Sequence, residues 1–320
     1  MKKILIFGAG VLGSLYAARL RLSGLDVTLL ARNTRLEDIK THGIVLEHAL
    51  TGKREVVTVP VVAHLQENDA YDLIVVLVRK NQLASVLPVL ASHKATPNIL
   101  FMVNNPSGYV EWADAVGRER LVLGFAGAGG TLVGHVVRYI VVSRFLQPTT
   151  FGELDGASSA RLQELKHAFH DAGFPTALTS NMDAWQKTHV GWVSPIANAL
   201  YMVNCDSTVL ARSPHVLRMA VRAVREGFSA LRTMGIPVTP TTLRIWECVP
   251  ESLLVRSLMF LAGTKYFRTV IVEHTVSASD EMRLIADEFR TVIESASIAT
   301  PAIDELRSFI PRPVQAGPNA

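Results

Sequence analysis

The stretch that decides the fold is the first 32 residues, MKKILIFGAGVLGSLYAARLRLSGLDVTLLAR, from Met1 to Arg32. An apolar run from Ile4 to Phe7 is typical of a buried strand, and it leads directly into a G-x-G-x-x-G turn. Helical spacing of apolar residues then continues to about Leu22, and a second apolar run, 27–31, ends at Arg32. Strand, glycine turn, helix and strand in this order predict a dinucleotide-binding βαβ unit.

Each glycine of this turn has its own expected role. Gly8 permits the tight turn off the strand, Gly10 lets the backbone approach a pyrophosphate, and Gly13 lets the helix pack close to the sheet. The phosphates would lie at the N-terminus of the following helix, where unpaired N–H groups attract anions. We therefore expect the whole turn to bind the cofactor: Gly8, Ala9, Gly10, Val11, Leu12 and Gly13.

The residue at the end of the second strand indicates which dinucleotide is bound. An NAD enzyme carries an acidic residue there, about 20 residues after the glycines, that binds the hydroxyls of the adenosine ribose. This chain has Arg32 instead. A guanidinium matches a phosphate in a bidentate way, so the sequence predicts NADP(H) as cofactor, with Arg32 at the 2′-phosphate.

Composition excludes several classes of protein. The chain has 320 residues, of which 49% are hydrophobic and 19% charged, so it has material for large cores and about two domains. The net charge of +4 comes from scattered residues, which favours an anionic small molecule over nucleic acid as partner. Two cysteines are too few for a disulfide framework. The apolar stretch 257–263 is too short to cross a membrane, and we expect a soluble, cytoplasmic protein.

Strand and helix patterns alternate through the first half of the chain. We expect a short helix at 36–41 ended by Gly43, and a hairpin at 44–47 and 55–62. The run from Asp72 to Val78 is typical of a strand buried on both faces. Further expected elements are a helix at 82–92, strands of the same sheet at 98–103, 121–125, 136–142 and 149–152, and a helix at 160–172 closed by Gly173.

From residue 183 the pattern changes to long helices, at about 183–204, 214–234 and 280–297. The sequence thus predicts an α/β fold: a Rossmann-type, doubly wound sheet domain over 1–178 and an all-α domain over 179–320 that carries substrate-binding and dimerisation surfaces. The helix 216–231 is apolar on more than one face, which a homodimer contact or burial within its own domain would each explain.

Landmarks along nearly the whole chain resemble the ketopantoate reductase family, the 2-dehydropantoate 2-reductases. The N-terminal landmarks are residues 8–13, Arg32, 42–46, 72–79, Gln82 and Val103-Asn104. The C-terminal ones are 183–187, Glu226, Gly235, Glu281 and Thr300-Pro301. The resemblance implies an NADPH-dependent reductase of pantothenate biosynthesis, with the cofactor on the Rossmann domain and a 2-oxo acid bound against the helical domain.

The same resemblance assigns roles to four further residues. Lys187 is similar in position to the family's catalytic lysine, whose ammonium can stabilise a developing alkoxide and donate a proton. Asn104 and Arg79 are similar to residues that contact the cofactor, Arg79 standing where relatives carry lysine. Glu281 stands where relatives carry a glutamate that helps to hold the substrate, although Glu273-His274 is a competing pair.

The departures from the family bear on the substrate. Relatives carry asparagines four and eight residues after the lysine, and this chain has Gly191 and Pro195 there. A serine pair of relatives reads Arg268-Thr269. Missing amides remove hydrogen bonds that would discriminate between substrates, so we expect the preferred acid to differ from ketopantoate.

Three functions remain open at this point. The first is a reductase of 2-oxo acids; the second is an inactive NADP(H)-binding sensor or partner protein; the third is reductive condensation of an amine with a 2-oxo acid. The histidines lack the spacing of a metal site and no G-x-S-x-G is present, so we expect no metal and no serine hydrolase.

Overall fold

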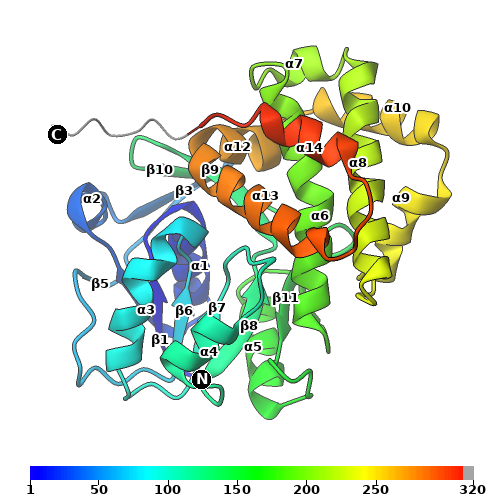
Figure 1. The fold of residues 1–320 in the computed structure, drawn as a ribbon. Coiled ribbons are helices and arrows are strands. Elements are labelled where there is room, and N and C mark those ends of the chain that lie inside the picture. The colour runs from blue at the N-terminus through cyan, green and yellow to red at the C-terminus, as the bar shows by residue number, and fades with distance from the viewer. Residues whose placement is uncertain (313–320) are drawn as a thin grey trace, which may run out of the picture. The chain divides into compact units, whose positions relative to one another are not determined.

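The computed structural model describes residues 1–312. The chain forms two compact units (Figure 1). Unit 1 consists of Met1–Asn104 and Gly108–Asp183, and unit 2 consists of Asn105–Ser107 together with the chain from Ala184 onward. The short segment Asn105–Ser107 therefore belongs to the helical unit although it lies in the N-terminal half of the sequence.

Unit 1 is built on an eight-stranded sheet with the order β12-β11-β8-β7-β6-β1-β2-β5. Neighbouring strands are parallel except for β11, which runs antiparallel to β8. The strands are β1 (Lys3–Phe7), β2 (Asp26–Leu30), β5 (Val61–Val62), β6 (Leu73–Val76), β7 (Ile99–Phe101), β8 (Leu121–Phe125), β11 (Thr149–Gly152) and β12 (Thr176–Leu178). Every residue of β6 is buried, as its continuous apolar run predicts.

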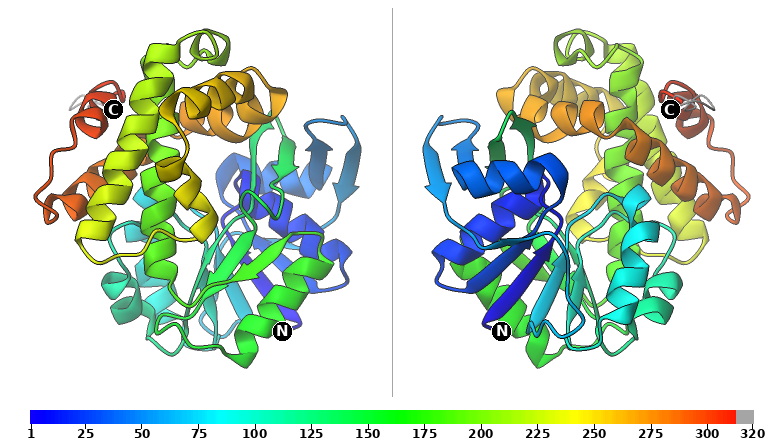
Figure 2. Two further views of the ribbon diagram at one scale, coloured as in Figure 1. Left: turned by 90° about the vertical axis from the view of Figure 1, so that its right-hand side faces the viewer. Right: turned by 90° about the vertical axis from the view of Figure 1, so that its left-hand side faces the viewer.

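Helices cover both faces of this sheet (Figure 2). On one face lie α1 (Val11–Leu22) and α5 (Ala160–Asp171), and on the other α3 (Leu83–Ser92) and α4 (Val110–Val116). Phe169 of α5 packs edge-on against Phe151 of β11 at 5.0 Å between ring centroids. Trp112 of α4 stacks on Phe101 of β7 at 4.8 Å. The predicted doubly wound sheet is confirmed.

A second, four-stranded sheet packs beside α1 with the order β4-β3-β10-β9. Its strands are β3 (Ile44–His48), β4 (Arg54–Val57), β9 (Ala128–Val133) and β10 (Val136–Val141). The predicted hairpin is confirmed for β3 and β4. Its second strand ends at Val57 and does not continue to 62, because Val61–Val62 forms β5, which pairs with β2 in the main sheet. The prediction that 136–142 continues the main sheet is wrong, because β10 pairs with β9 across a turn at Gly134 (φ 59°) and with β3 on its other side. An alternating pattern identifies a strand but not its partners.

Two helix ends of unit 1 follow the expected chemistry. The helix α2 (Asn33–His42) ends at Gly43, which has φ 68°, and α5 is followed by Gly173 with φ 90°. A residue without Cβ adopts such positive φ values without steric cost, so these two positions end their helices.

Within residues 105–107 and 184–312, unit 2 consists of helices and the segments that connect them, and no strand occurs. Its elements are α6 (Met182–Tyr201, whose first two residues belong to unit 1), α7 (Ser207–Leu210), α8 (Pro214–Thr233), η2 (Thr241–Arg244), α9 (Ile245–Cys248), α10 (Glu251–Ala262), α11 (Lys265–Phe267), the π-helical η3 (Arg268–Val272), α12 (Glu273–Ser277), α13 (Ser279–Glu294) and α14 (Pro301–Ser308). Within residues 1–312 no helix is both long and apolar enough to span a membrane.

The helix α8 lies at the centre of unit 2, where it packs against α10 and α14. Its buried residues, from Val216 to Leu231, lie on several faces of the helix. Burial within the unit therefore accounts for the apolar pattern that a dimer contact would also have explained.

Glu226 of α8 explains one landmark of the sequence. Its carboxylate accepts hydrogen bonds from the backbone N–H groups of Ala302 at 3.1 Å and Ile303 at 3.0 Å, just after Pro301. These groups have no partner within a helix, so Glu226 caps α14. Burial raises the pKa of the Glu226 carboxyl. Glu226 and the Thr300-Pro301 pair thus form one structural feature.

Candidate functional site

The topology gathers the predicted cofactor residues at one edge of the main sheet. The strands β2, β1, β6 and β7 are neighbours and run parallel, so their carboxyl ends lie at the same edge. The glycine turn follows β1, Arg32 follows β2, Arg79 follows β6 and Asn104 follows β7. Ligands of open α/β sheets bind at such an edge, next to the strands where the chain order reverses.

Two glycines of the turn are required by close backbone contacts. Gly8 has φ 114°, and a Cβ added there would lie 2.5 Å from the carbonyl oxygen of Leu77. A Cβ at Gly13 would overlap the carbonyl oxygen of Gly8. Gly10 differs, because a Cβ there would meet no atom within 4 Å. The space in front of Gly10 is open, as the approach of a pyrophosphate requires.

The start of α1 suits an anion. Gly10 is its N-cap, and the first turn, which begins with the half-buried Val11 and Leu12, contains no acidic residue. The Ser14 N–H donates to the carbonyl oxygen of Gly10 at 2.9 Å. The N–H groups before this bond have no partner within the helix, and the helix dipole adds partial positive charge. The glycine turn and α1 therefore fit the pyrophosphate of a dinucleotide.

Two arginines of α2 reach this turn. Arg32, the exposed N-cap of α2, places its guanidinium carbon 6.0 Å from the centre of the Phe7 ring. Arg35, half-buried one turn later, donates from Nε to the carbonyl oxygen of Ala9 at 3.2 Å and from Nη2 to Ser14 Oγ at 3.1 Å. Arg35 is not among the residues that the sequence predicts at the cofactor. Its spacing of three residues from Arg32, which places both on one helix face, is the signal that would have found it.

Arg79 and Asn104 occupy the next two strand ends, and both are half-buried. The backbone N–H of Arg79 donates to Gln82 Oε1 at 3.2 Å, which closes the short 3-10 helix η1 (Lys80–Gln82). Their side chains are therefore presented from the same edge as the glycine turn.

The residue after Asn104 has a structural role. Asn105 is fully buried; its N–H donates to Gln186 Oε1 at 3.0 Å, and its own Oδ1 accepts from the Ser107 N–H at 3.2 Å. Gln186, itself buried, precedes Lys187 on α6. The Asn105 side chain therefore closes the turn that packs on α6.

Lys187 is half-buried on α6, and an aromatic cluster lies beside it on the same helix. The rings of Trp185 and His189 are nearly parallel, with an angle of 5° between their planes and 5.3 Å between their centroids. Burial lowers the pKa of His189 to about 3, and the charge of His274 contributes in the same direction. His189 is thus neutral near pH 7, which leaves Lys187 as the cation of this turn.

The face of α6 that continues from Lys187 is packed inside unit 2. A Cβ at Gly191 would lie 2.9 Å from Cζ of Phe289, whose ring fills the space beside the helix. Pro195 and Asn198 line a cavity of about 10 Å³, room for roughly one water molecule. Asn198 donates to Ser194 Oγ at 3.2 Å. Gly191 and Pro195, four and eight residues after Lys187, therefore lie beside an aromatic ring and a small cavity, respectively.

Glu281 and Thr269 lie on other elements of the same unit. Glu281 is buried in the first turn of α13, with 4% of its surface exposed. Thr269 is buried in the π-helical segment η3, whereas Arg268 is exposed. The competing pair Glu273-His274 is half-buried on α12. Single π-helical turns occur frequently at functional sites.

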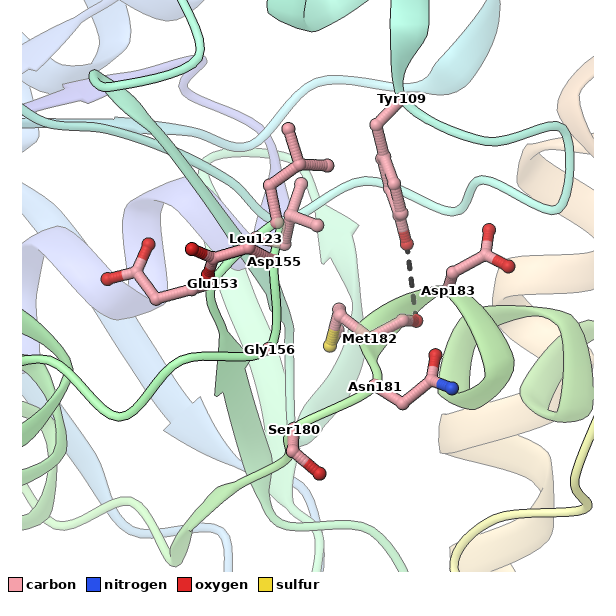
Figure 3. Close-up of a pocket in the computed structure, with 10 residues that line it drawn as sticks. Tyr109, Leu123, Glu153, Asp155, Gly156, Ser180, Asn181, Met182 and Asp183 are labelled. Carbon is pink, nitrogen blue, oxygen red and sulfur yellow. Dashed lines mark hydrogen bonds between the residues drawn. The ribbon is translucent and has the colours of Figure 1, made fainter.

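A pocket of about 220 Å³ lies elsewhere in unit 1 (Figure 3). Tyr109 donates from its hydroxyl to the carbonyl oxygen of Met182 at 3.3 Å on one side of it. Glu153 is engaged by Arg161 and Ser159. None of the ten lining residues is a predicted site residue. Within residues 1–312 no group of three or more His, Cys, Asp or Glu could hold a metal ion.

Comparison with known proteins points to one family. Residues 4–156 match the family model described as ketopantoate reductase PanE/ApbA. A curated relative, the 2-dehydropantoate 2-reductase of Pyrococcus horikoshii, is 26% identical over 273 residues, which cover 80% of this chain and 79% of that protein. The 2-dehydropantoate 2-reductase of Archaeoglobus fulgidus is 28% identical over 73% of this chain and 76% of its own.

Solved structures share the fold. A 2-dehydropantoate 2-reductase from Geobacter metallireducens superposes with a TM-score of 0.79 at 17% identity, covering 96% of this chain and 98% of its own. A ternary structure of D-mandelate dehydrogenase with NADH and anilino(oxo)acetate has a TM-score of 0.77 at 18% identity, covering 96% of each chain. The predicted resemblance to the ketopantoate reductase family is confirmed.

Proposed function

Because this chain is a divergent relative of the ketopantoate reductases, we propose that it is an NADPH-dependent reductase of a 2-oxo acid. The product would be the corresponding 2-hydroxy acid, from 2-dehydropantoate or a related substrate. The observation that carries the proposal is the sheet edge where the glycine turn, Arg32, Arg79 and Asn104 follow four neighbouring parallel strands.

The cofactor is NADP(H). The open space at Gly10, the absence of acidic residues from the first turn of α1 and the arginine after β2 together fit a dinucleotide with a 2′-phosphate. When bound, NADPH supplies the hydride. The glycine turn binds the pyrophosphate, Arg32 and Arg79 provide positive charge, and Asn104 orients the cofactor.

Lys187 carries the protein's share of the chemistry. Its ammonium donates a hydrogen bond to the ketone oxygen, which favours the negative charge that develops there as the carbonyl is reduced. The same group then transfers a proton to that oxygen and completes the hydroxyl. His189, neutral because it is buried, does not compete for this proton. Glu281 holds the substrate.

The test is NADPH oxidation with ketopantoate and a panel of branched and aromatic 2-oxo acids. We expect turnover with at least one acid, and a decrease of kcat of about 10²- to 10⁴-fold in Lys187→Ala, the size typical of a lost general acid. Lys166→Ala is the matched control, because Lys166 is also a half-buried helix lysine, on α5. That variant should keep the wild-type rate.

Unchanged turnover in Lys187→Ala would refute the assigned chemistry. NADPH binding without turnover of any acid would refute the reductase and leave an NADP(H)-binding protein. Consumption of NADPH only when an amine is added would indicate reductive condensation instead.

A further inference from the structure

The first turn of α2 carries two guanidinium groups that both lie against the β1–α1 turn. Arg32 contacts the ring of Phe7, the residue before Gly8, and Arg35 donates to the carbonyl oxygen of Ala9, the residue after it. The two arginines therefore contact the residues that immediately precede and follow Gly8. They come from one helix turn and reach the edge where the adenosine half of a dinucleotide would bind.

Arg35 is held firmly. Its guanidinium donates from Nε to Ala9 and from Nη2 to Ser14 Oγ, and Nη1 lies 3.6 Å from Asp38 Oδ2. Because a guanidinium has five N–H donors, these contacts leave N–H groups of Arg35 that can donate to a further acceptor. The side chain is 17% exposed, and burial lowers the pKa of the guanidinium, as expected for a charge withdrawn from water. A charge in such a place acts on a nearby anion more strongly than one in free solvent.

We propose that Arg35 is a second cofactor-binding residue, which completes with Arg32 a two-arginine site for the 2′-phosphate of NADP(H). The inference rests on the proposed NADPH dependence and adds a residue that determines specificity. Arg32 provides an exposed guanidinium, and Arg35 provides a fixed one that also ties α2 to the glycine turn. NADH, which has no 2′-phosphate, would gain nothing from this pair.

The test uses two small ligands that differ only in the group of interest, adenosine 2′,5′-bisphosphate and adenosine 5′-monophosphate. The ratio of their dissociation constants, measured by calorimetry on the full chain, isolates the 2′-phosphate. We expect the preference for the bisphosphate to decrease by about tenfold or more in Arg35→Met, as for a lost charge-assisted hydrogen bond. Arg35→Lys, which keeps the charge, should keep most of the preference.

Arg21→Met is the matched control. Arg21 lies in the last turn of α1, is 41% exposed and pairs with Asp26, so this variant removes the same charge away from the turn. Its preference should equal that of the wild type. In Asp38→Asn, which removes the carboxylate that competes for Arg35, the preference should rise severalfold. This variant keeps the test valid if Arg35→Met does not fold.

The outcomes separate the two proposals. A wild-type chain that binds neither NADPH nor the bisphosphate would refute the proposed cofactor. If the wild-type chain binds NADPH and the bisphosphate, but Arg35→Met loses affinity for the bisphosphate and for the monophosphate by the same factor, Arg35 only supports the turn. An unchanged preference in both Arg35→Met and Asp38→Asn would also overturn the two-arginine site.

Discussion

Gly13 and Gly191 are both glycines at which a side chain would collide with a neighbour, but the causes differ. At Gly13 the obstacle is the backbone oxygen of Gly8, five residues away in the same turn. At Gly191 it is the ring of Phe289, almost a hundred residues away on α13. The first requirement is local and belongs to the motif, whereas the second arises only when distant helices pack.

This difference corresponds to two kinds of functional region. The geometry of the β1–α1 turn is fixed by contacts between backbone atoms. The face of α6 after Lys187 is shaped by side chains, because the Phe289 ring lies against Gly191 and Pro195 lines a small cavity. We therefore expect cofactor binding to depend on the motif and substrate preference to depend on side-chain packing.

The largest expected effect tests the backbone side of this comparison. Gly13→Ala should lower the free energy of unfolding by about 3 kcal/mol, because neither the turn nor the helix can move away from the added methyl group. Gly10→Ala should cost less than about 1 kcal/mol, since its Cβ meets open space, yet it should weaken NADPH binding. Urea unfolding and fluorescence titration measure the two quantities. Equal destabilisation by both variants would contradict the account.

The next effect concerns the aromatic face of α6. The pKa of His189 is about 3 in the folded chain and about 6.5 when unfolded, so the unfolded state binds more protons between these values. Stability should therefore fall as the pH drops below 6.5, by about 2 kcal/mol at pH 5. His189→Phe keeps the ring against Trp185 and should remove this part of the pH dependence.

Denaturant unfolding at several pH values is the measurement for His189. His167→Phe is the control, because His167 is exposed on α5 and should leave the pH dependence unchanged. If His189→Phe retains the full acid sensitivity of the wild type, a different group is responsible.

The smallest effect tests the side-chain half of the comparison. Gly191→Ala gains about 1 kcal/mol of helix propensity but forces the Phe289 ring to shift, so we expect a net loss of about 1 kcal/mol. A Cβ added at Gly227 would lie 3.3 Å from Cε1 and Cζ of the same ring, so α8 also borders this end of Phe289. In a Phe289→Leu background the same substitution should become stabilising, and a double-mutant cycle in urea measures this change of sign. Additive effects would show that Phe289 does not restrict position 191.

The sequence was sufficient where the determining contacts are local. The glycine turn, the buried run of β6 and the glycines that end α2 and α5 act within a few residues, and the structure confirms these elements. It was insufficient for β10, whose partners β9 and β3 cannot be identified from its own alternation. The helix and sheet composition of the chain was thus predictable, but the second sheet was not.

The candidate site shows the same limit. Arg32 could be predicted from motif and spacing, whereas the hydrogen bonds from Arg35 to Ala9 and Ser14, on which its proposed role depends, are evident only in the structure. The absence of the two asparagines was evident from the sequence, but their replacement by Phe289 and a small cavity was not.

The most direct test of the central claim is to follow the transferred hydrogen. NADPH carrying deuterium at carbon 4 of the nicotinamide, prepared as each of its two stereoisomers, is incubated with the 2-oxo acid that the chain reduces fastest. The account predicts that one isomer delivers its deuterium to the carbinol carbon of the 2-hydroxy acid, as mass spectrometry would show. A product that contains deuterium from neither isomer, or the absence of any reduced acid, would contradict it.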